Sequence, residues 1–398
     1  MSYKLRFGTF IAPFHSLKED PTLCLERDLD LVTLLDDLDY DEAWVGEHHS
    51  GGMEIIPSPE IFIAMSSQRT KHIRYGTGVV SLPYHNPLMV AQRINYLDHL
   101  TRGRVAFGMG PGALPTDMMM IGVPVSKSRT RMEEAIKAII PLLRGESVTM
   151  KTDWFDLTDA RISIDPYTRP SVEMAVAAVA SPGGPVTAGQ YGIGLLSVAA
   201  TAGPGFNALK STWEIAEQAA KDNGNRIDRA NWRVVGPMHI AETREQARAE
   251  VRYGIEEHIR YFREVAALPI VPEGVDSVDV LTESGFAVIG TPDDAIAQIE
   301  RLQEQSGGFG TYLLFDHNWV PWEAKKRSHE MIARYVRPHF QSSNVARRSS
   351  YNWAKGHREQ VTKEFNARTA ARTAQHIKEK GTQHLDPALV SSLEPTEK

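Results

Sequence analysis

An α/β fold, a barrel of repeated βα units around a parallel sheet, is predicted by the alternation of short apolar runs with amphipathic helical segments. The alternation continues from the start of the chain to about residue 338. The length of 398 residues is compatible with one barrel, because such barrels often exceed about 200 residues as a single domain. We therefore expect one barrel domain over residues 1–340 with insertions.

The individual elements follow from their hydrophobic periodicity and from their start and stop signals. Helices with one apolar face are expected at 87–100 and 132–143, and the run TPDD at 291–294 is a strong helix start. Apolar and polar residues alternate over 148–164, which predicts a β-hairpin outside the barrel. Residues 253–284 are expected to form an insertion that helps to cover the barrel mouth. The expected strands are 5–10, 42–46, 73–82, 104–109, 172–180, 194–199, 232–240 and 311–315.

Composition excludes several classes of protein. The net charge of −6 and the mixed signs argue against a nucleic-acid surface, which needs clustered basic residues. The single cysteine, Cys24, excludes an intrachain disulfide, and no apolar run is long enough to cross a membrane. Residues 1–7 lack the apolar core of a secretion signal. We therefore expect a cytoplasmic protein with no nucleic-acid or membrane partner.

The segment 341–398 differs from the rest of the chain. It is polar and carries ten Lys and Arg against six Asp and Glu. Helical propensity is highest over residues 358–378, without a strong apolar stripe. The segment is expected to be a partly helical C-terminal extension, either an exposed helix with a frayed tail or an arm that packs on a neighbouring subunit.

Polar residues that follow strands are the first candidates for a site, because βα barrels place their active sites at the carboxyl ends of the strands. Glu47, His48 and His49 follow the segment 42–46. Histidine can donate a hydrogen bond to an anion or move a proton near neutral pH. The three residues could instead only satisfy one another. We predict no metal site, because adjacent residues of an extended segment point to opposite faces.

Glycines interrupt two of the predicted strands. Gly76 and Gly78 lie inside the segment 73–82, and residues 107–112 have the sequence FGMGPG. Glycine in a strand marks a bulge or a close approach of a ligand to the backbone. The second run would leave room for a planar ring at the end of its strand, although a plain loop is the alternative.

An anion site is predicted at residues 180–185, of sequence ASPGGP, which precede a short helix containing Thr187. Small residues expose backbone N–H groups there, and the helix dipole attracts phosphate. Barrels of this type often bind phosphate late in the strand order. Arg129, on the loop before a helix, could add a fixed positive charge, or it could be a solvated surface residue.

Several short stretches, in a common order and spacing, resemble the bacterial luciferase-like flavin-dependent monooxygenases, most closely the limonene monooxygenase branch. The resemblance runs from Phe7 to about Phe340. The stretches are WVGEHH at 44–49, PSPE at 57–60, LPYHNP at 82–87, Leu97-Asp98 with Gly103-Arg104, residues 122–129, and GTP at 290–292.

The resemblance implies a (β/α)8 TIM barrel that binds FMN at the carboxyl ends of its strands. His48 matches the family's catalytic histidine beside the reactive edge of the flavin, and Gly78–Val79 matches a cis peptide under the ring. Phe10, Phe14 and Met118 to Met120 are expected to line a dry substrate pocket, or else to pack in the core. The expected cofactor contacts are Thr77, Gly78, Val79, Gly110, Arg129, Ala180, Ser181, Gly183, Gly184 and Ser197.

Two positions depart from the family pattern. Luciferase has a phosphate-binding arginine where this chain has Pro111, which leaves more of the phosphate contact to Arg129. The family glycine that ends the first helix is here Asp39. Aspartate adopts the left-handed conformation less readily than glycine, but it can do so.

The resemblance also implies a two-component reaction. An NAD(P)H-dependent flavin reductase supplies reduced FMN, and O2 gives one oxygen atom to a small hydrophobic substrate such as a terpene, cyclic ketone or aldehyde. The other oxygen atom leaves as water. A homodimer or a larger homo-oligomer is expected. Two alternatives stay open: a deazaflavin-dependent oxidoreductase on the same scaffold, and a flavin-binding protein without turnover.

Overall fold

The chain divides into two units of contacting residues, Met1–Gln341 and Ser342–Lys398. The second unit covers nearly the same residues as the expected extension, of which 392–398 lie outside the described part of the chain. The computed structural model describes residues 4–12, 14–266, 268 and 270–391.

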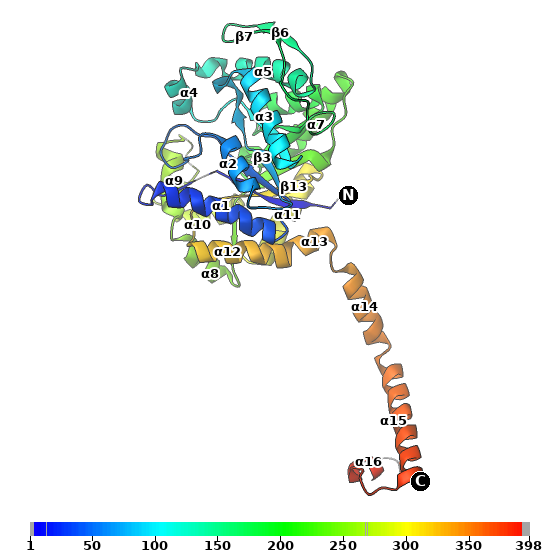
Figure 1. Ribbon diagram of the computed structural model, residues 1–398. Coiled ribbons are helices and arrows are strands. Elements are labelled where there is room, and N and C mark those ends of the chain that lie inside the picture. The colour runs from blue at the N-terminus through cyan, green and yellow to red at the C-terminus, as the bar shows by residue number, and fades with distance from the viewer. Residues whose placement is uncertain (1–3, 13, 267, 269, 392–398) are drawn as a thin grey trace. The chain divides into compact units, whose positions relative to one another are not determined.

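Eight parallel strands close a barrel in the first unit, with helices outside it (Figure 1). Each strand pairs in parallel with its neighbours, and the last strand returns to pair with the first, as Phe7 does with Tyr312. The closed pairing confirms the predicted (β/α)8 barrel. The strands are β1 (Arg6–Ile11), β2 (Glu42–Val45), β3 (Arg74–Thr77), β5 (Val105–Gly110), β8 (Glu173–Ala178), β9 (Gly194–Ser197), β10 (Trp232–Gly236) and β13 (Thr311–Phe315).

Two of the predicted strands are each divided in the structure. The segment 73–82 forms β3 and the short β4 (Val80–Ser81), with a cis peptide bond between Gly78 and Val79. The segment 232–240 was wrongly predicted as one strand. Pro237 cannot donate a ladder hydrogen bond, and after it β11 (Met238–Ile240) pairs with β12 (Val288–Gly290) outside the barrel.

The helices between the strands begin at the expected signals. Asn86 caps the helix at 87, and Thr291 with Asp294 forms a capping box. A π-helical turn, Ile332–Val336, follows α12. The helices of this unit are α1 (Pro21–Asp37), α2 (Pro59–Ser67), α3 (Pro87–Thr101), α4 (Pro115–Ile121), α5 (Ser128–Leu143), α6 (Gly183–Tyr191), α7 (Gly203–Asp222), α8 (Arg244–Val251), α9 (Ile255–Glu264), α10 (Ser277–Glu283), α11 (Pro292–Ser306), α12 (Trp322–Met331) and α13 (Arg337–Gln341).

The predicted excursions from the barrel are present. Strands β6 (Val148–Lys151) and β7 (Asp156–Ala160) pair antiparallel, which confirms the hairpin. The segment 253–284 contains α9 and α10, and residues of α9 pack against the apolar side chains inside the barrel. The insertion therefore covers part of the barrel mouth, as the sequence leads us to expect.

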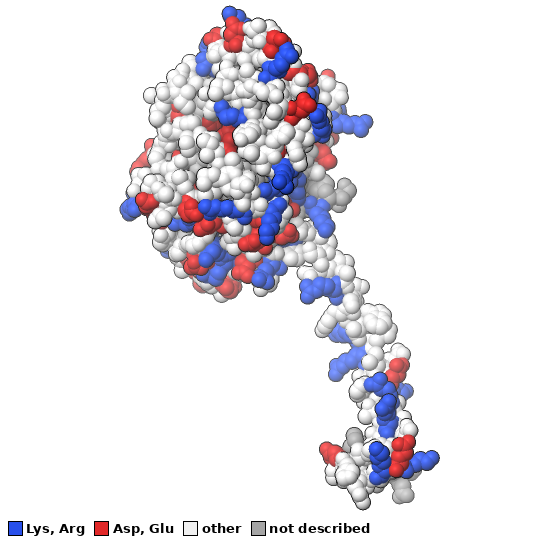
Figure 2. Space-filling view, viewed as in Figure 1, with Lys and Arg blue, Asp and Glu red and all other residues white. Residues whose placement is uncertain are grey.

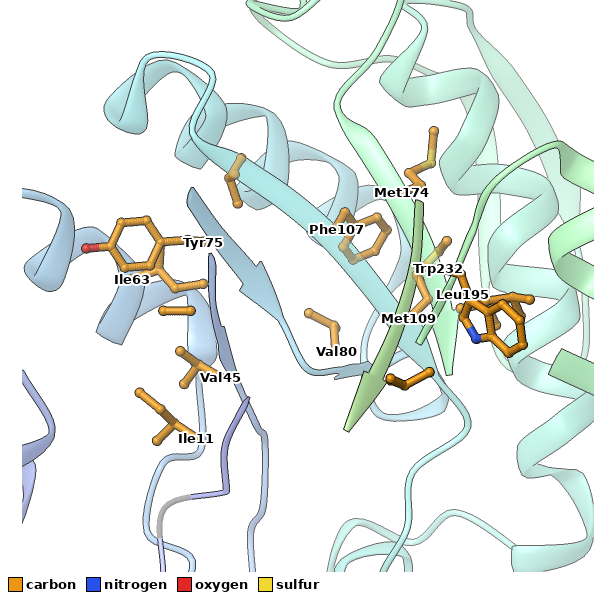
Figure 3. Close-up of a cluster of buried hydrophobic side chains, with 14 of the residues drawn as sticks. Ile11, Val45, Ile63, Tyr75, Val80, Phe107, Met109, Met174, Leu195 and Trp232 are labelled. Carbon is orange, nitrogen blue, oxygen red and sulfur yellow. The ribbon is translucent and has the colours of Figure 1, made fainter. Parts of the chain in front are cut away.

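Apolar side chains alternate along the strands between two cores. Leu195 packs in the large core between strands and helices, whereas the next residue, Leu196, packs inside the barrel. Figure 3 shows members of the outer core, including Val45, Phe107 and Met109, beside the strands that carry them. The alternation is the period-two pattern of strands, and it assigns strand residues to the barrel interior or to the helix layer.

Charged residues fill the amino-terminal end of the barrel interior, which the sequence did not predict. Arg233 is fully buried, and it binds Glu42 at 2.9 Å and Glu173 at 2.5 Å. Arg6 and Arg74 each add a contact to one of these two carboxylates. Burial disfavours the charged form of Glu42, but the positive charges of Arg233 and Arg6 lower its pKa to about 2. This end of the barrel thus holds a buried ion network, in which removal of one partner would leave an uncompensated buried charge.

The second unit is helical. The predicted helix at 358–378 is confirmed as α15 (Arg358–Lys380), whereas α14 (Val345–Gly356) was not predicted, and α16 (Pro387–Ser391) is short. None of the helices in the described part of the chain combines the length and the apolar character that a membrane span requires. On the first unit, Figure 2 shows basic and acidic side chains interspersed over the visible face, without a large basic patch.

Candidate active site

His48 lies three residues beyond the carboxyl end of β2, at the mouth of the barrel, between two carboxylates. Its Nδ1 is 3.0 Å from Oδ2 of Asp117 on α4, and its Nε2 is 3.4 Å from Oε1 of Glu54. Asp117 also accepts hydrogen bonds from the His49 backbone N–H and the Ser50 hydroxyl. The ring orientation of His48 is therefore fixed through Nδ1, and the longer Nε2 contact is weak by hydrogen-bond criteria.

The two carboxylates favour the charged form of the imidazole. Burial lowers the pKa of His48, but the hydrogen bond to Asp117 and the negative charge of Glu54 outweigh it and raise the pKa. Burial raises the pKa of Glu54, which accepts a 2.5 Å hydrogen bond from the hydroxyl of Tyr261 on α9. In this arrangement His48 can offer hydrogen-bond donors to an anion.

Aromatic side chains close the mouth above His48. Phe14 contacts the rings of Tyr261 and Phe262 from α9, at centroid distances of 4.9 and 5.7 Å. Phe10 stacks on Phe315 at 5.9 Å. Phe10 and Phe14 therefore belong to one apolar cluster that continues into the barrel interior.

The three methionines of α4 do not act as one surface. Met118 is buried, with 4% of its surface exposed, and its methyl group lies near Gly112. Met119 and Met120 are 76% and 70% exposed. The expectation that Met119 and Met120 would line the substrate pocket was wrong. Successive residues of a helix point in different directions, and of these three only Met118 faces inward.

Arg129 and the ASPGGP segment come together. A Cβ atom placed on Gly183 would lie 2.8 Å from Nη1 of Arg129, so the guanidinium packs against this glycine at the amino end of α6. Nη1 is buried and has no hydrogen-bond partner among the described residues. Arg129 was expected on a loop, but it lies in the first turn of α5, which begins four residues earlier than predicted.

A phosphate group fits this corner of the barrel. A buried guanidinium nitrogen without a partner is costly, and an anion would satisfy it. The first backbone N–H groups of α6 have no partners within the helix, and its dipole adds attraction for negative charge. Gly184 approaches the end of β8, while Ala180 and Ser181 are exposed on the connecting loop. The residues present therefore fit the phosphate end of FMN.

The glycines in the strands make room for the protein's own side chains. A Cβ on Gly76 would lie 2.2 Å from the Trp44 indole, and one on Gly108 would meet the same ring at 2.8 Å. A Cβ on Gly110 would lie 2.6 Å from a methyl group of Val79. Within the run 107–112, Trp44 and Val79 take the space beside Gly108 and Gly110, so the predicted approach of a planar ring could use only the backbone there and stays a prediction.

The backbone around residues 77–79 is held in place by neighbouring strands. The Thr77 hydroxyl donates to the Gly108 carbonyl and accepts from the Gly108 N–H, both at 2.8 Å. The bond between Gly78 and Val79 is cis, as the resemblance implies. Val79 packs with the apolar cluster of the barrel interior.

Ser197 points away from the barrel interior. Its hydroxyl accepts a 3.0 Å hydrogen bond from the indole N–H of Trp232, which packs in the outer core. The next residue, Val198, packs with the interior cluster instead. A contact of Ser197 with a ligand at the end of β9 would therefore have to come from its backbone.

The two departures from the family pattern are accommodated in the structure. Asp39 adopts the left-handed conformation, with φ of 62°, just after α1. Pro111 follows the end of β5, and Arg129, with its unpartnered Nη1 among the described residues, is a candidate for the missing phosphate charge.

A parallel (β/α)8 barrel with a buried arginine against a helix start late in the strand order, and a histidine between two carboxylates at its mouth, is typical of cofactor-binding barrel enzymes. The family model described as luciferase-like monooxygenase matches residues 5–308. The chain therefore belongs to the luciferase-like monooxygenase family, and it is an enzyme of the flavin-dependent monooxygenase class.

The relatives include named monooxygenases. The chain is 46% identical to limonene 1,2-monooxygenase of Rhodococcus erythropolis, over 93% of this chain and 98% of the relative. It is 42% identical to 4-hydroxyprotoasukamycin monooxygenase of Streptomyces nodosus subsp. asukaensis, over 88% and 96%. The oxygenating constituent of 3,6-diketocamphane monooxygenase from Pseudomonas putida, solved with FMN, superposes with a TM-score of 0.71 at 23% identity, over 84% and 98%. That structure supports the fold.

Proposed function

We propose that the protein takes reduced FMN from a separate NAD(P)H-dependent flavin reductase and uses O2 to insert one oxygen atom into a small hydrophobic substrate. The observation that carries this proposal is the buried Nη1 of Arg129, without a partner among the described residues, against Gly183 at the start of α6. A flavin with a phosphate tail supplies the anion that this corner needs.

The cofactor, when bound, supplies the two electrons that activate O2. Arg129 and the first turn of α6 would hold the phosphate and so orient the cofactor. Gly78 and Val79 would contact the ring. Further contacts in this proposal are Thr77, Gly110, Ala180, Ser181, Gly184 and the backbone of Ser197.

His48 is the proposed catalytic residue. Asp117 fixes the ring through Nδ1, and Nε2 has only a long contact to Glu54, so its N–H is available to donate to a ligand oxygen. A hydrogen bond from Nε2 would stabilise negative charge that develops on oxygen during the reaction. Glu54 would keep the imidazole charged while Tyr261 satisfies the other carboxylate oxygen.

The aromatic cluster would exclude water and bind the substrate. Phe10, Phe14 and Met118 are buried beside the mouth, and α9 covers it. A dry, apolar site suits a terpene, cyclic ketone or aldehyde. It also excludes water, which would promote side reactions of the activated oxygen before it reaches the substrate. We further propose a homodimer or larger homo-oligomer in the cytoplasm, where the thiol of Cys24 stays reduced.

The test supplies the purified protein with reduced FMN or, in parallel, a reduced deazaflavin, together with ¹⁸O2 and a panel of terpenes, cyclic ketones and aldehydes. The proposal requires that a product carrying one ¹⁸O atom forms with reduced FMN and not with the reduced deazaflavin. A product without ¹⁸O that forms only with the deazaflavin would favour the oxidoreductase alternative. Binding of reduced FMN without any product from the panel or any faster O2 consumption would favour a flavin-binding protein.

A further inference from the structure

A second group of ionisable side chains lies beside His48 but faces another direction. Oε1 of Glu47 is 2.8 Å from Nε2 of His49 and 2.6 Å from Nε2 of His85. One donor atom from each residue lies within 4.8 Å of the other two. His48 binds Asp117 and Glu54 instead, so neighbouring histidines serve separate clusters.

The carboxylate of Glu47 is held in one orientation. Its other oxygen, Oε2, accepts a 2.7 Å hydrogen bond from the backbone N–H of Ser81 in β4. The carboxylate is 1% exposed, whereas the side chains of His49 and His85 are 21% and 22% exposed. Oriented ligands with hydrogen-bonded second oxygens are typical of metal sites, and the exposed imidazoles leave a route from solvent.

The donor set has the chemistry of a borderline divalent cation. Two imidazole nitrogens and one carboxylate oxygen are a common set for Zn²⁺, with a fourth position left to water. Ligand atoms around tetrahedral Zn²⁺ lie about 3.3 Å apart, given bonds of about 2.0 to 2.1 Å. The present separations of 2.6 and 2.8 Å from Glu47 to the two imidazoles would need to open by less than about 1 Å.

The grouping of Glu47, His49 and His85 could not be predicted from the sequence. Glu47 and His49 point to the same side because they are two residues apart on an extended segment, as strand periodicity requires. His85 comes from the turn after β4, 38 residues from Glu47 in the chain. The prediction of no metal site considered only the run 47–49, in which His48 and His49 diverge.

We propose that Glu47, His49 and His85 form a binding site for a divalent transition metal of the Zn²⁺ type, separate from the proposed flavin site. A bound ion would link the segment after β2 to the turn after β4. Because it binds the folded chain through residues from two segments, the ion would stabilise the fold, and the stabilisation would grow with the logarithm of its free concentration above the Kd.

The test uses the full chain, stripped with a chelator and without flavin, titrated with Zn²⁺ against a chromogenic chelator. We expect one Zn²⁺ per chain and a Tm that rises with Zn²⁺ concentration. His49→Asn, His85→Asn and Glu47→Gln should each weaken binding by at least about 10-fold. His339→Asn is the matched control, because His339 is half-exposed and bonded only to Glu300 in the described structure, and it should bind Zn²⁺ like the wild type.

A Co²⁺ absorption spectrum of the wild type tests the site without relying on variants that fail to fold. Co²⁺ in place of Zn²⁺ should give the visible bands of a tetrahedral site with nitrogen and oxygen ligands and no thiolate charge-transfer band. A thiolate band that Cys24→Ser removes would assign the ion to the second possible group, His15, Glu19 and Cys24, and would overturn the proposal. Absence of stoichiometric binding, or binding that His85→Asn leaves unchanged, would also overturn it.

Discussion

Nδ1 of His48 lies 3.0 Å from Oδ2 of Asp117, although the two residues are 69 positions apart in the chain. The contact joins the segment after β2 to helix α4, which follows β5. It decides which nitrogen of His48 can serve a ligand, since Nδ1 is engaged and Nε2 has only a contact of 3.4 Å. The proposed chemistry therefore depends on a helix whose role the sequence did not indicate.

Arg129→Ala should weaken the binding of reduced FMN by ~1–3 kcal/mol, because it removes a charge-assisted contact to phosphate. Riboflavin, which lacks the phosphate, should bind the variant as it binds the wild type. Anaerobic titration followed by flavin fluorescence measures both affinities, with Arg144→Ala at the exposed end of the same helix as the control. Equal losses for FMN and riboflavin would show that Arg129 does not contact phosphate.

Gly183→Ala tests the proposed phosphate site through the glycine that packs against Arg129. The added Cβ would lie 2.8 Å from Nη1 of Arg129, and the flexible guanidinium should move away at little cost to stability. FMN affinity should fall by up to ~1 kcal/mol, since the charge is displaced but not removed. The urea midpoint should hardly change. A variant with unchanged FMN affinity would indicate that Arg129 is not needed at this position.

Gly76→Ala should destabilise the fold by ~3 kcal/mol, at the upper end for overpacking. Its Cβ would lie 2.2 Å from the indole of Trp44, a side chain that is fully enclosed in the barrel. Gly203→Ala is the control, because no atom lies within 4 Å of its added Cβ. Urea unfolding followed by circular dichroism gives both free energies, and equal values for the two variants would contradict the packing described.

The stability of the fold should fall on acidification, in part through His329. Burial lowers its pKa to about 4 from 6.5, and Lys325 and His239 act in the same direction against Asp316. A histidine held neutral binds fewer protons in the folded state than in the unfolded state. Its contribution is therefore fully present above pH 6.5 and is lost as the pH falls toward 4.

His329→Gln should reduce this pH dependence. Between about pH 7 and 4.5 the wild type should lose ~2–3 kcal/mol more unfolding free energy than the variant. The backbone carbonyl of His329, which accepts from Tyr40, is retained in the variant. Parallel pH dependences for the two proteins would rule out the neutral buried state of His329.

The sequence was a good guide to the barrel and a partial guide to the site. Periodicity located the barrel strands because each has one face in the interior and one against helices, as Leu195 and Leu196 illustrate. It failed where a single residue breaks a strand, as Pro237 does. The left-handed conformation of Asp39 and the start of α11 at Thr291 follow from local chemistry and were correctly expected.

The contacts of the site could not be predicted, because they join distant segments. Asp117, Glu54 and Tyr261 follow no strand directly, and their roles appear only when α4 and α9 pack at the barrel mouth. Gly76 and Gly108 indicated a close approach correctly, but the sequence did not show that the side chain approaching them is that of Trp44. Strand alternation could have shown that Ser197 faces outward, since its neighbour Leu196 faces inward.

The proposed role of His48 as a hydrogen-bond donor to the reacting oxygen is tested by the ratio of oxygenated product to reduced FMN consumed in His48→Ala. The variant should fold and bind reduced FMN like the wild type, because Arg129 and the start of α6 are untouched. Product formation should fall by ~10²–10³-fold while hydrogen peroxide is released. His339→Ala should couple like the wild type. A His48→Ala enzyme that still converts its reduced FMN fully into product would show that His48 does not have this role.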